Sequence, residues 1–268
     1  MKTFLEYSQL QEKLILFNHG SKYGQVVIMA GGAGSGKSFV VKNFIENDKF
    51  KVINVDDWKE AFLTLSRLQG QYKEIRHLSL GNPQDVSKLH QFIKDKGIRN
   101  KVFQGLFGSE RNLELLPNIL FDITGKNLHD IEELGELAQR AGYSPESIHI
   151  LYVLTEWRTA YRRNLSRTRT IASQIFIETH RGATQTLQRI LNNELPGSID
   201  GRIDIVLNNP EESEFHKDSK VVKDFTYINV KKEGHTINSD EEIASTVEGW
   251  LEKNAPKSAV NSTYRIEK

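Results

Sequence analysis

The chain has 268 residues, of which 38% are hydrophobic and 26% charged, a composition typical of a soluble globular protein and not of a disordered one. Its formal net charge of +1 gives no overall field toward nucleic acid or membrane, so a basic binding surface would have to be local. The absence of cysteine excludes disulfides, thiolate metal sites and cysteine nucleophiles. No apolar run approaches the ~20 residues that span a bilayer, and Met1–Leu16 does not resemble a secretory signal. We therefore expect a cytoplasmic protein with no membrane partner.

Strand-like and helical stretches alternate along the chain. After an expected amphipathic helix over 4–17, the strand patterns are Gln25–Met29, Lys51–Val55, Asn118–Asp122, His149–Val153, Ile203–Leu207 and a less regular Phe225–Val230. Helical patterns cover Lys37–Glu46, most of Trp58–Pro117, Leu128–Ala141, Glu156–Leu191 with a break near Arg169, and Ser239–Lys253. The alternation predicts an α/β fold: a three-layer sandwich with a mostly parallel sheet of five or six strands. Ligands of such folds bind at the carboxyl ends of the strands.

The turn after the first strand carries a phosphate-binding motif. Its residues Gly31, Gly32, Ala33, Gly34, Ser35, Gly36, Lys37 and Ser38 fit the pattern G-x-x-x-x-G-K-[ST]. Glycines let successive backbone N–H groups curl around an anion, and the helix that begins near Lys37 adds the positive end of its dipole. Lys37 can place its charge on the β- and γ-phosphates of ATP, and Ser38 offers a hydroxyl to Mg²⁺.

A chance glycine turn is the alternative to this interpretation. The strand directly before the motif and the helix directly after it disfavour that alternative, because a functional phosphate loop needs both. The motif therefore predicts a P-loop NTPase fold of the nucleoside-monophosphate-kinase type.

Acidic residues follow the second and third strands. Asp122 could hold Mg²⁺ or its water shell opposite Ser38, or it could merely cap a turn. Either Asp56 or Asp57 could accept the proton of an attacking hydroxyl. Because side chains alternate along an extended segment, only one of the two would face the site. The other is a candidate for binding the substrate or for capping the next helix, and the residues alone leave the choice open.

A later helical stretch is rich in arginine and poor in carboxylates. The arginines are Arg158, Arg162, Arg163, Arg167, Arg169 and Arg181. Guanidinium groups suit phosphate oxygens, so this stretch could form a lid that stabilises the charge on the transferred phosphoryl group and excludes water. The alternatives are a solvated basic face, which suits most of these arginines, and a strip that contacts nucleic acid.

Five features occur in a fixed order. They are the strand and loop VVIMAGGAGSGKS, then INVDDWK, LFDITGK, a helix that ends in Ala141-Gly142-Tyr143, and YRRNLSRTRT. In this order they resemble the zeta-toxin-like family of P-loop kinases, over about Val26–Ile190. The loop is common to many NTPases, so the ordered set carries the likeness.

The resemblance implies transfer of the γ-phosphate of ATP, with Mg²⁺, to a hydroxyl, which in the toxins is the sugar 3′-hydroxyl of UDP-N-acetylglucosamine. It favours Asp56 as the general base, because Asp56 matches the second aspartate of the family's I-D-x-D-x-[FW]-[RK] motif. It gives Thr124 a role in positioning the substrate, and it makes Arg163, or its neighbour Arg162, and Arg169 the charge-stabilising pair. An antitoxin partner is compatible with the resemblance, although nothing in the residues indicates one.

The chain departs from the family pattern at several positions. Asn54 stands where the first aspartate of the second motif is expected, and Ile123 replaces a glycine in the third motif, where Gly125 follows Thr124. The stretch 58–117 has no recognisable counterpart. Polynucleotide 5′-hydroxyl kinases and phage kinases of modified DNA bases resemble this layout almost as well.

We expect a single P-loop kinase domain over 1–268, with a helical substrate-side insertion at about 58–117. An arginine-rich lid is expected at about 156–193, and a flexible tail at about 255–268. The leading hypothesis is a kinase that acts on a small or nucleotide-linked hydroxyl substrate. A nucleic-acid kinase is the second hypothesis, and a nucleotide-switched interaction module without kinase activity is the third.

Overall fold

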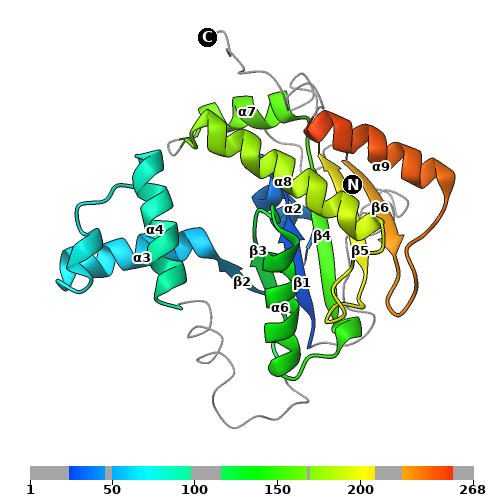
Figure 1. Cartoon of the computed structure of the whole chain (residues 1–268), viewed down its shortest axis with the longest axis horizontal. Coiled ribbons are helices and arrows are strands. Elements are labelled where there is room, and N and C mark those ends of the chain that lie inside the picture. The colour runs from blue at the N-terminus through cyan, green and yellow to red at the C-terminus, as the bar shows by residue number, and fades with distance from the viewer. Residues whose placement is uncertain (1–23, 46–49, 98–115, 168–169, 209–224, 256–268) are drawn as a thin grey trace, which may run out of the picture.

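The computed structural model describes residues 24–45, 50–97, 116–167, 170–208 and 225–255. Within them, one six-stranded sheet has the order β2-β3-β1-β4-β5-β6. Its strands are β1 (Val26–Ala30), β2 (Lys51–Asn54), β3 (Ile119–Asp122), β4 (Ile148–Leu154), β5 (Ile203–Asn208) and β6 (Phe225–Lys231). The pairs among the first five strands are parallel, and β6 runs antiparallel to β5. This confirms the prediction of a mostly parallel sheet (Figure 1).

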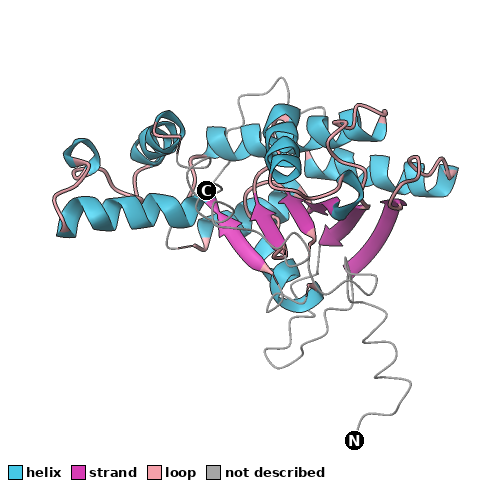
Figure 2. Ribbon diagram, turned by 90° about the horizontal axis from the view of Figure 1, so that it is seen from below, coloured by secondary structure: helices cyan, strands magenta, loops and turns pink. Residues whose placement is uncertain are grey.

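Helices cover both faces of the sheet (Figure 2). They are α2 (Lys37–Phe44), α3 (Val55–Leu68), α4 (Pro83–Asp95), α6 (Leu128–Arg140), α7 (Trp157–Leu165), α8 (Ser173–Leu191) and α9 (Glu241–Asn254), with 3-10 turns at Lys73–Ile75 and Pro145–Ser147. Side chains from α6, α8 and α9 share one hydrophobic cluster with the sheet, and side chains from α2 share a second cluster with it. The arrangement is the predicted three-layer sandwich.

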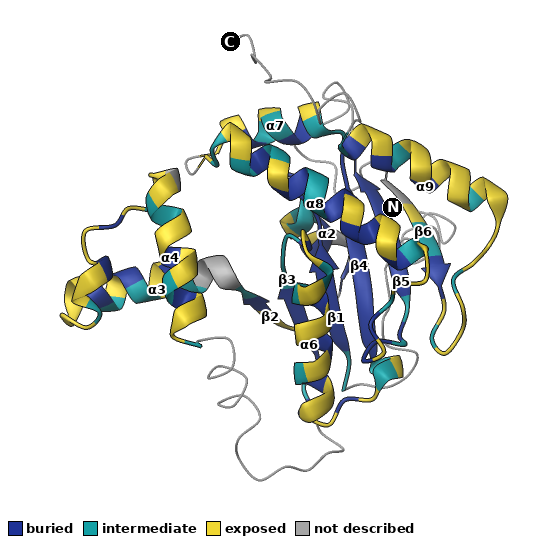
Figure 3. Ribbon diagram, viewed as in Figure 1, coloured by how far each residue is buried: buried dark blue, intermediate teal, exposed yellow. Residues whose placement is uncertain are grey.

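The central strand β1 shows why the sheet reads as apolar runs in the sequence. Val26 and Ile28 belong to the cluster on the side of α6 and α8, whereas Val27 and Met29 belong to the cluster on the side of α2. All four side chains are fully buried, and Figure 3 shows the sheet as the buried centre of the molecule. A strand covered on both faces needs apolar residues at every position and not at alternate ones.

The helices α3 and α4 extend beyond the β2 edge of the sheet (Figure 1). They enclose a small core of their own, in which the rings of Phe62, Tyr72 and Phe92 meet edge to face at centroid distances of 5.1 to 5.9 Å. These helices form part of the predicted insertion at 58–117, of which residues 98–115 lie outside the described part of the chain.

One strand–helix boundary differs from the prediction, and one predicted helix break depends on a specific side chain. The second strand was expected to reach Val55, but it ends at Asn54 and α3 begins at Val55. The predicted break near Arg169 lies between α7 and α8. There, the buried Asn164 accepts a hydrogen bond from the Ile171 backbone N–H at 3.1 Å and donates to the Ile171 carbonyl oxygen at 3.0 Å, which closes the connecting turn.

The expected helix over 4–17 and nearly all of the tail from 255 lie outside the described residues. Among the helices that are described, none has the length and apolar character required for a membrane span.

Candidate functional site

The phosphate loop follows β1 and leads directly into α2. Gly34 and Gly36 have φ angles of 76° and 91°, in the left-handed region that favours glycine. A Cβ at Gly34 would collide with the Ala160 carbonyl oxygen, and one at Gly36 would collide with the Asn208 side chain. Gly36 caps α2 without any side-chain hydrogen bond. A glycine cap brings no side-chain acceptor of its own to the backbone N–H groups of the first helical turn, as is common where a helix start binds an anion.

Lys37 and Asp122 meet beside this loop. Lys37 Nζ donates to the Gly31 carbonyl oxygen at 2.8 Å and lies 3.7 Å from Asp122 Oδ1. Both side chains are largely shielded, with 14% and 13% of their surface exposed, so solvent weakens their attraction less than it would at the surface. Ser38 lies in the first turn of α2 and is exposed.

Asn54 extends this group from the neighbouring strand. It lies opposite Asp122 in the parallel register of β2 and β3, and its Nδ2 donates to Asp122 Oδ2 at 3.3 Å. The family motif has an aspartate at the position of Asn54. A second carboxylate would repel Asp122, whereas the amide donates a hydrogen bond to it.

Asp56 and Asp57 lie in the first turn of α3, and their side chains are not among those that the structure describes. The expectation that they occupy an extended segment is wrong, because the helix begins at Val55. Strand β2 lies two positions from β1 in the sheet. About 10 Å, two strand spacings, therefore separate β1, which leads into the phosphate loop, from β2, which leads into α3.

The segment after β3 passes close to the phosphate loop. The Thr124 carbonyl oxygen accepts a hydrogen bond from the Gly31 N–H at 3.3 Å. Gly125 has a φ of 62°, and a Cβ at this position would stand 2.5 Å from the Ala30 Cβ. The departure from the family motif at Gly125 thus has a local cause: only glycine fits the left-handed backbone at this close approach.

The arginines of α7 have different surroundings. A Cβ at Gly36 would lie 3.5 Å from Arg163 Nη1, which places the Arg163 guanidinium against the phosphate loop. Arg162 instead donates to Thr159 Oγ1 at 3.4 Å. Arg158 is 68% exposed, lies 3.5 Å from Glu156 and stacks on the Trp157 ring.

The sequence left Arg163 and Arg162 as alternatives for the phosphate contact. In the structure it is Arg163 that lies against the phosphate loop. Arg167 is exposed, and Arg169 lies outside the described residues.

Polar residues that the sequence did not single out support the loop from behind. Thr155 Oγ1 lies 2.8 Å from the Ser35 carbonyl oxygen, and Asn208 Nδ2 donates to the same oxygen at 2.6 Å. His180 Nε2 lies 2.7 Å from the Ala33 carbonyl oxygen. Burial lowers the pKa of His180, which favours the neutral imidazole. Thr155 and Asn208 could have been suspected from their places at the carboxyl ends of β4 and β5. His180, in the middle of α8, gave no such signal.

The donor set suits Mg²⁺. Among the described residues no group of three or more His, Cys, Asp or Glu side chains could hold a metal by itself. The hydroxyl of Ser38 and the carboxylate of Asp122 are hard oxygen donors, and Mg²⁺ is commonly held by one or two such groups together with phosphate oxygens and water.

Comparison with known proteins establishes the fold. No family model matches the chain, and no curated protein sequence matches it. Among solved structures, it matches a chain of the AvrRxo1-ORF1:AvrRxo1-ORF2 complex with ATP, with a TM-score of 0.54 and 12% identity over 96% of this chain and 73% of that chain. The same complex with sulphate ions matches over the same shares at 12% identity, with a TM-score of 0.51.

A chain of the PezAT chromosomal toxin-antitoxin system of Streptococcus pneumoniae has a TM-score of 0.46 and 15% identity, over 95% of this chain and 97% of that chain. The chain thus shares its fold with the AvrRxo1 complex, and its strand order and loop placement are those of a P-loop NTPase.

Proposed function

We propose that this P-loop protein is an ATP- and Mg²⁺-dependent kinase that phosphorylates a hydroxyl of a small or nucleotide-linked substrate. The observation that carries the proposal is the meeting of Lys37 with Asp122 beside a loop whose helix start has no side-chain cap. A cation, a carboxylate and a row of backbone donors are the parts that hold a triphosphate with its metal. The shared fold with a complex solved with ATP supports the choice of nucleotide.

Each residue has a role in this proposal. The amides of residues 31–38 and Lys37 bind the β- and γ-phosphates, and Ser38 with Asp122 holds the metal. Mg²⁺, when bound, neutralises charge on the phosphates. Arg163 contacts the γ-phosphate from α7. The substrate hydroxyl oxygen forms a bond to the γ-phosphorus, the bond from that phosphorus to the β–γ bridging oxygen breaks to release ADP, and Asp56 accepts the hydroxyl proton.

The acceptor is proposed from sequence motifs that resemble zeta-toxin-like kinases, and a nucleotide sugar such as UDP-N-acetylglucosamine is the first substrate to test. The protein is incubated with γ-labelled ATP and Mg²⁺ in separate nucleotide-sugar, nucleoside and DNA pools. We expect label in the nucleotide-sugar pool. Label in DNA alone would favour a nucleic-acid kinase. If ATP binds but no pool is labelled, the kinase proposal is wrong and a nucleotide-switched module becomes the better interpretation.

Arg163→Ala is expected to weaken ATP binding by about tenfold, because one charge-assisted hydrogen bond contributes roughly 1.5 kcal/mol. Arg163→Lys should recover part of this loss, since it keeps the charge but not the planar fork. Calorimetric titration with ATP and Mg²⁺ measures both dissociation constants.

Arg158→Ala is the matched control, because Arg158 lies on the same helix but pairs with Glu156 at the surface. It should change the dissociation constant for ATP less than about twofold, because an exposed ion pair contributes little free energy. Equal effects of the two alanine variants would show that α7 contributes only general positive charge.

A further inference from the structure

The last described helix reaches the phosphate loop through two buried side chains. Asn254, the final residue of α9, is fully buried. Its Oδ1 lies 3.2 Å from His180 Nδ1 and accepts from the Thr155 N–H at 3.4 Å, and its Nδ2 donates to Thr184 Oγ1 at 2.7 Å. His180 Nε2 in turn lies 2.7 Å from the Ala33 carbonyl oxygen. Asn254 and His180 therefore connect the end of α9 with the loop.

This connection determines where the loop amides point. The Ala33 carbonyl oxygen can only accept a hydrogen bond, so His180 Nε2 carries the proton in this contact. In the neutral ring Nδ1 then carries no proton, so its approach to Asn254 Oδ1 is a packing contact and not a hydrogen bond. In a trans peptide the carbonyl and the following N–H point in opposite directions, and the described residues contain no cis peptide. A carbonyl of Ala33 held from behind therefore directs the Gly34 N–H to the front, where a phosphate would bind.

The contact at Ser35 acts in the same way. Thr155 and Asn208 hold the Ser35 carbonyl oxygen from behind, which directs the Gly36 N–H forward. Asn254 bonds to the backbone N–H of Thr155 and, through Nδ2 at 3.4 Å, to the backbone carbonyl oxygen of His180. The end of α9 thus touches both supports of the loop.

Close packing makes the connection stiff. A Cβ at Gly32 would stand 2.5 Å from His180 Nε2, so the imidazole fills the space behind the loop. The ring also packs on Phe176 at a centroid distance of 4.5 Å. Asparagine is seldom fully buried, and burying an amide is unfavourable unless its hydrogen bonds are made. Asn254 makes them: Oδ1 accepts from the Thr155 N–H, and Nδ2 donates to Thr184 Oγ1 and to the His180 carbonyl oxygen.

We infer that Asn254 and His180 are positioning residues for the phosphate loop, so that docking of the end of α9 and binding of ATP stabilise each other. The coupling to ATP rests on the proposed function, whereas the positioning role concerns the loop alone. Coupling between two binding events is reciprocal. ATP should therefore protect the end of α9, and loss of Asn254 should weaken ATP binding.

The first experiment needs no nucleotide. Backbone hydrogen exchange is measured in the full chain and in Asn254→Ala and His180→Gln. Both substitutions should raise exchange in peptides that cover 31–38 by about fivefold, the effect of losing roughly 1 kcal/mol of hydrogen bonding.

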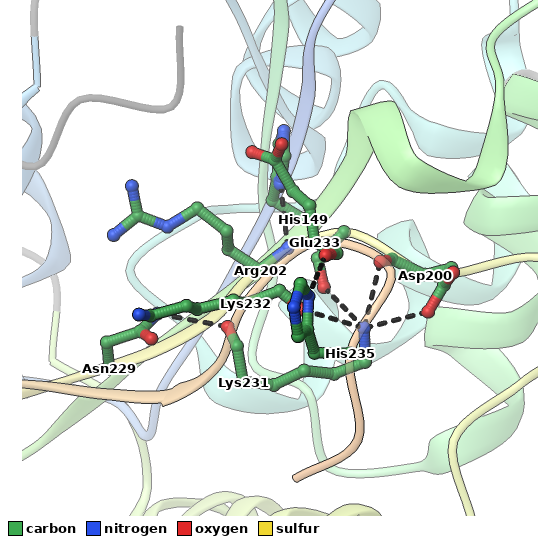
Figure 4. A network of polar contacts seen from close by, with 9 residues as sticks. His149, Asp200, Arg202, Asn229, Lys231, Lys232, Glu233 and His235 are labelled. Atoms are coloured by element: carbon green, nitrogen blue, oxygen red, sulfur yellow. Dashed lines mark hydrogen bonds and ion pairs between the residues drawn. The ribbon is translucent and has the colours of Figure 1, made fainter. Parts of the chain in front are cut away.

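His149→Gln is the matched control for this experiment. His149 is also fully buried, but it lies at the amino-terminal end of β4, where Nδ1 accepts from the Arg202 N–H at 2.9 Å (Figure 4). Its Nε2 lies 2.6 Å from Gln25 Oε1. It should leave exchange at 31–38 unchanged even where it lowers overall stability. If His180→Gln does not fold, Asn254→Ala decides the question.

The second experiment adds ATP and Mg²⁺. The nucleotide should slow exchange over 247–255 in the unaltered chain, and Asn254→Ala should raise the dissociation constant by about fivefold. Exchange that rises in Asn254→Ala only within α9, and not at 31–38, overturns the inference. A different outcome is that the variants exchange faster at 31–38 but the unaltered protein binds no ATP. The positioning role would then stand, and the proposed function would be wrong.

Discussion

Lys37→Ala is expected to abolish ATP binding at micromolar concentrations and to remove turnover. Lys37 donates to Gly31 and lies beside Asp122, so it is held next to the loop before any ligand arrives. Each hydrogen bond from a charged donor to phosphate contributes roughly 1.5–3 kcal/mol, and Lys37 would make more than one. We therefore expect the dissociation constant to rise by about a hundredfold or more, as measured by calorimetry with ATP and Mg²⁺.

Lys42→Ala is the control, because Lys42 is an exposed lysine on the same helix. It should bind ATP as the unaltered protein does. Circular dichroism must show that both variants keep their helical content, since Lys37 also contacts the loop backbone. A folded Lys37→Ala protein with undiminished affinity would contradict the assignment of this loop as the phosphate site.

Asp56→Asn is expected to leave ATP binding nearly intact and to lower turnover by about a hundredfold or more, the usual contribution of a general base. Asparagine keeps the size of the side chain but cannot take up the hydroxyl proton. The measurement is the rate of labelled product formation at saturating ATP, alongside the dissociation constant for ATP.

Asp57→Asn is the matched variant, since the two aspartates are adjacent in the first turn of α3. We expect a smaller loss with Asp57→Asn, confined mainly to the Michaelis constant for the substrate. A larger loss of turnover at Asp57 than at Asp56 would reverse the assignment of the base.

The sequence predicted those features that depend on residues close together in the chain. The phosphate loop, the helix after it and the strand before it form one continuous stretch, and Gly34 and Gly36 have a local conformational reason in their positive φ angles. The apolar runs predicted the strands, and their alternation with helices predicted the parallel sheet. The boundary at Val55 was wrong because α3 follows β2 directly, with no loop residue between Asn54 and Val55 to mark the change in the sequence.

Tertiary structure alone brought the remaining residues to the site. Asn54 and Asp122 are 68 positions apart and meet because β2 pairs in register with β3. Nothing in the spacing of Arg162 and Arg163 tells which of them faces Gly36, since that depends on how α7 rotates as it packs.

The support behind the loop is the clearest case of this division. His180 lies 147 positions from Ala33, and Asn254 lies 74 positions from His180. By itself the sequence determined the local backbone of the phosphate loop, because φ angles and helix starts depend on neighbouring residues. Only the packing of α8 and α9 against the sheet decided which side chains hold that loop in place, because such contacts depend on strand order and helix orientation.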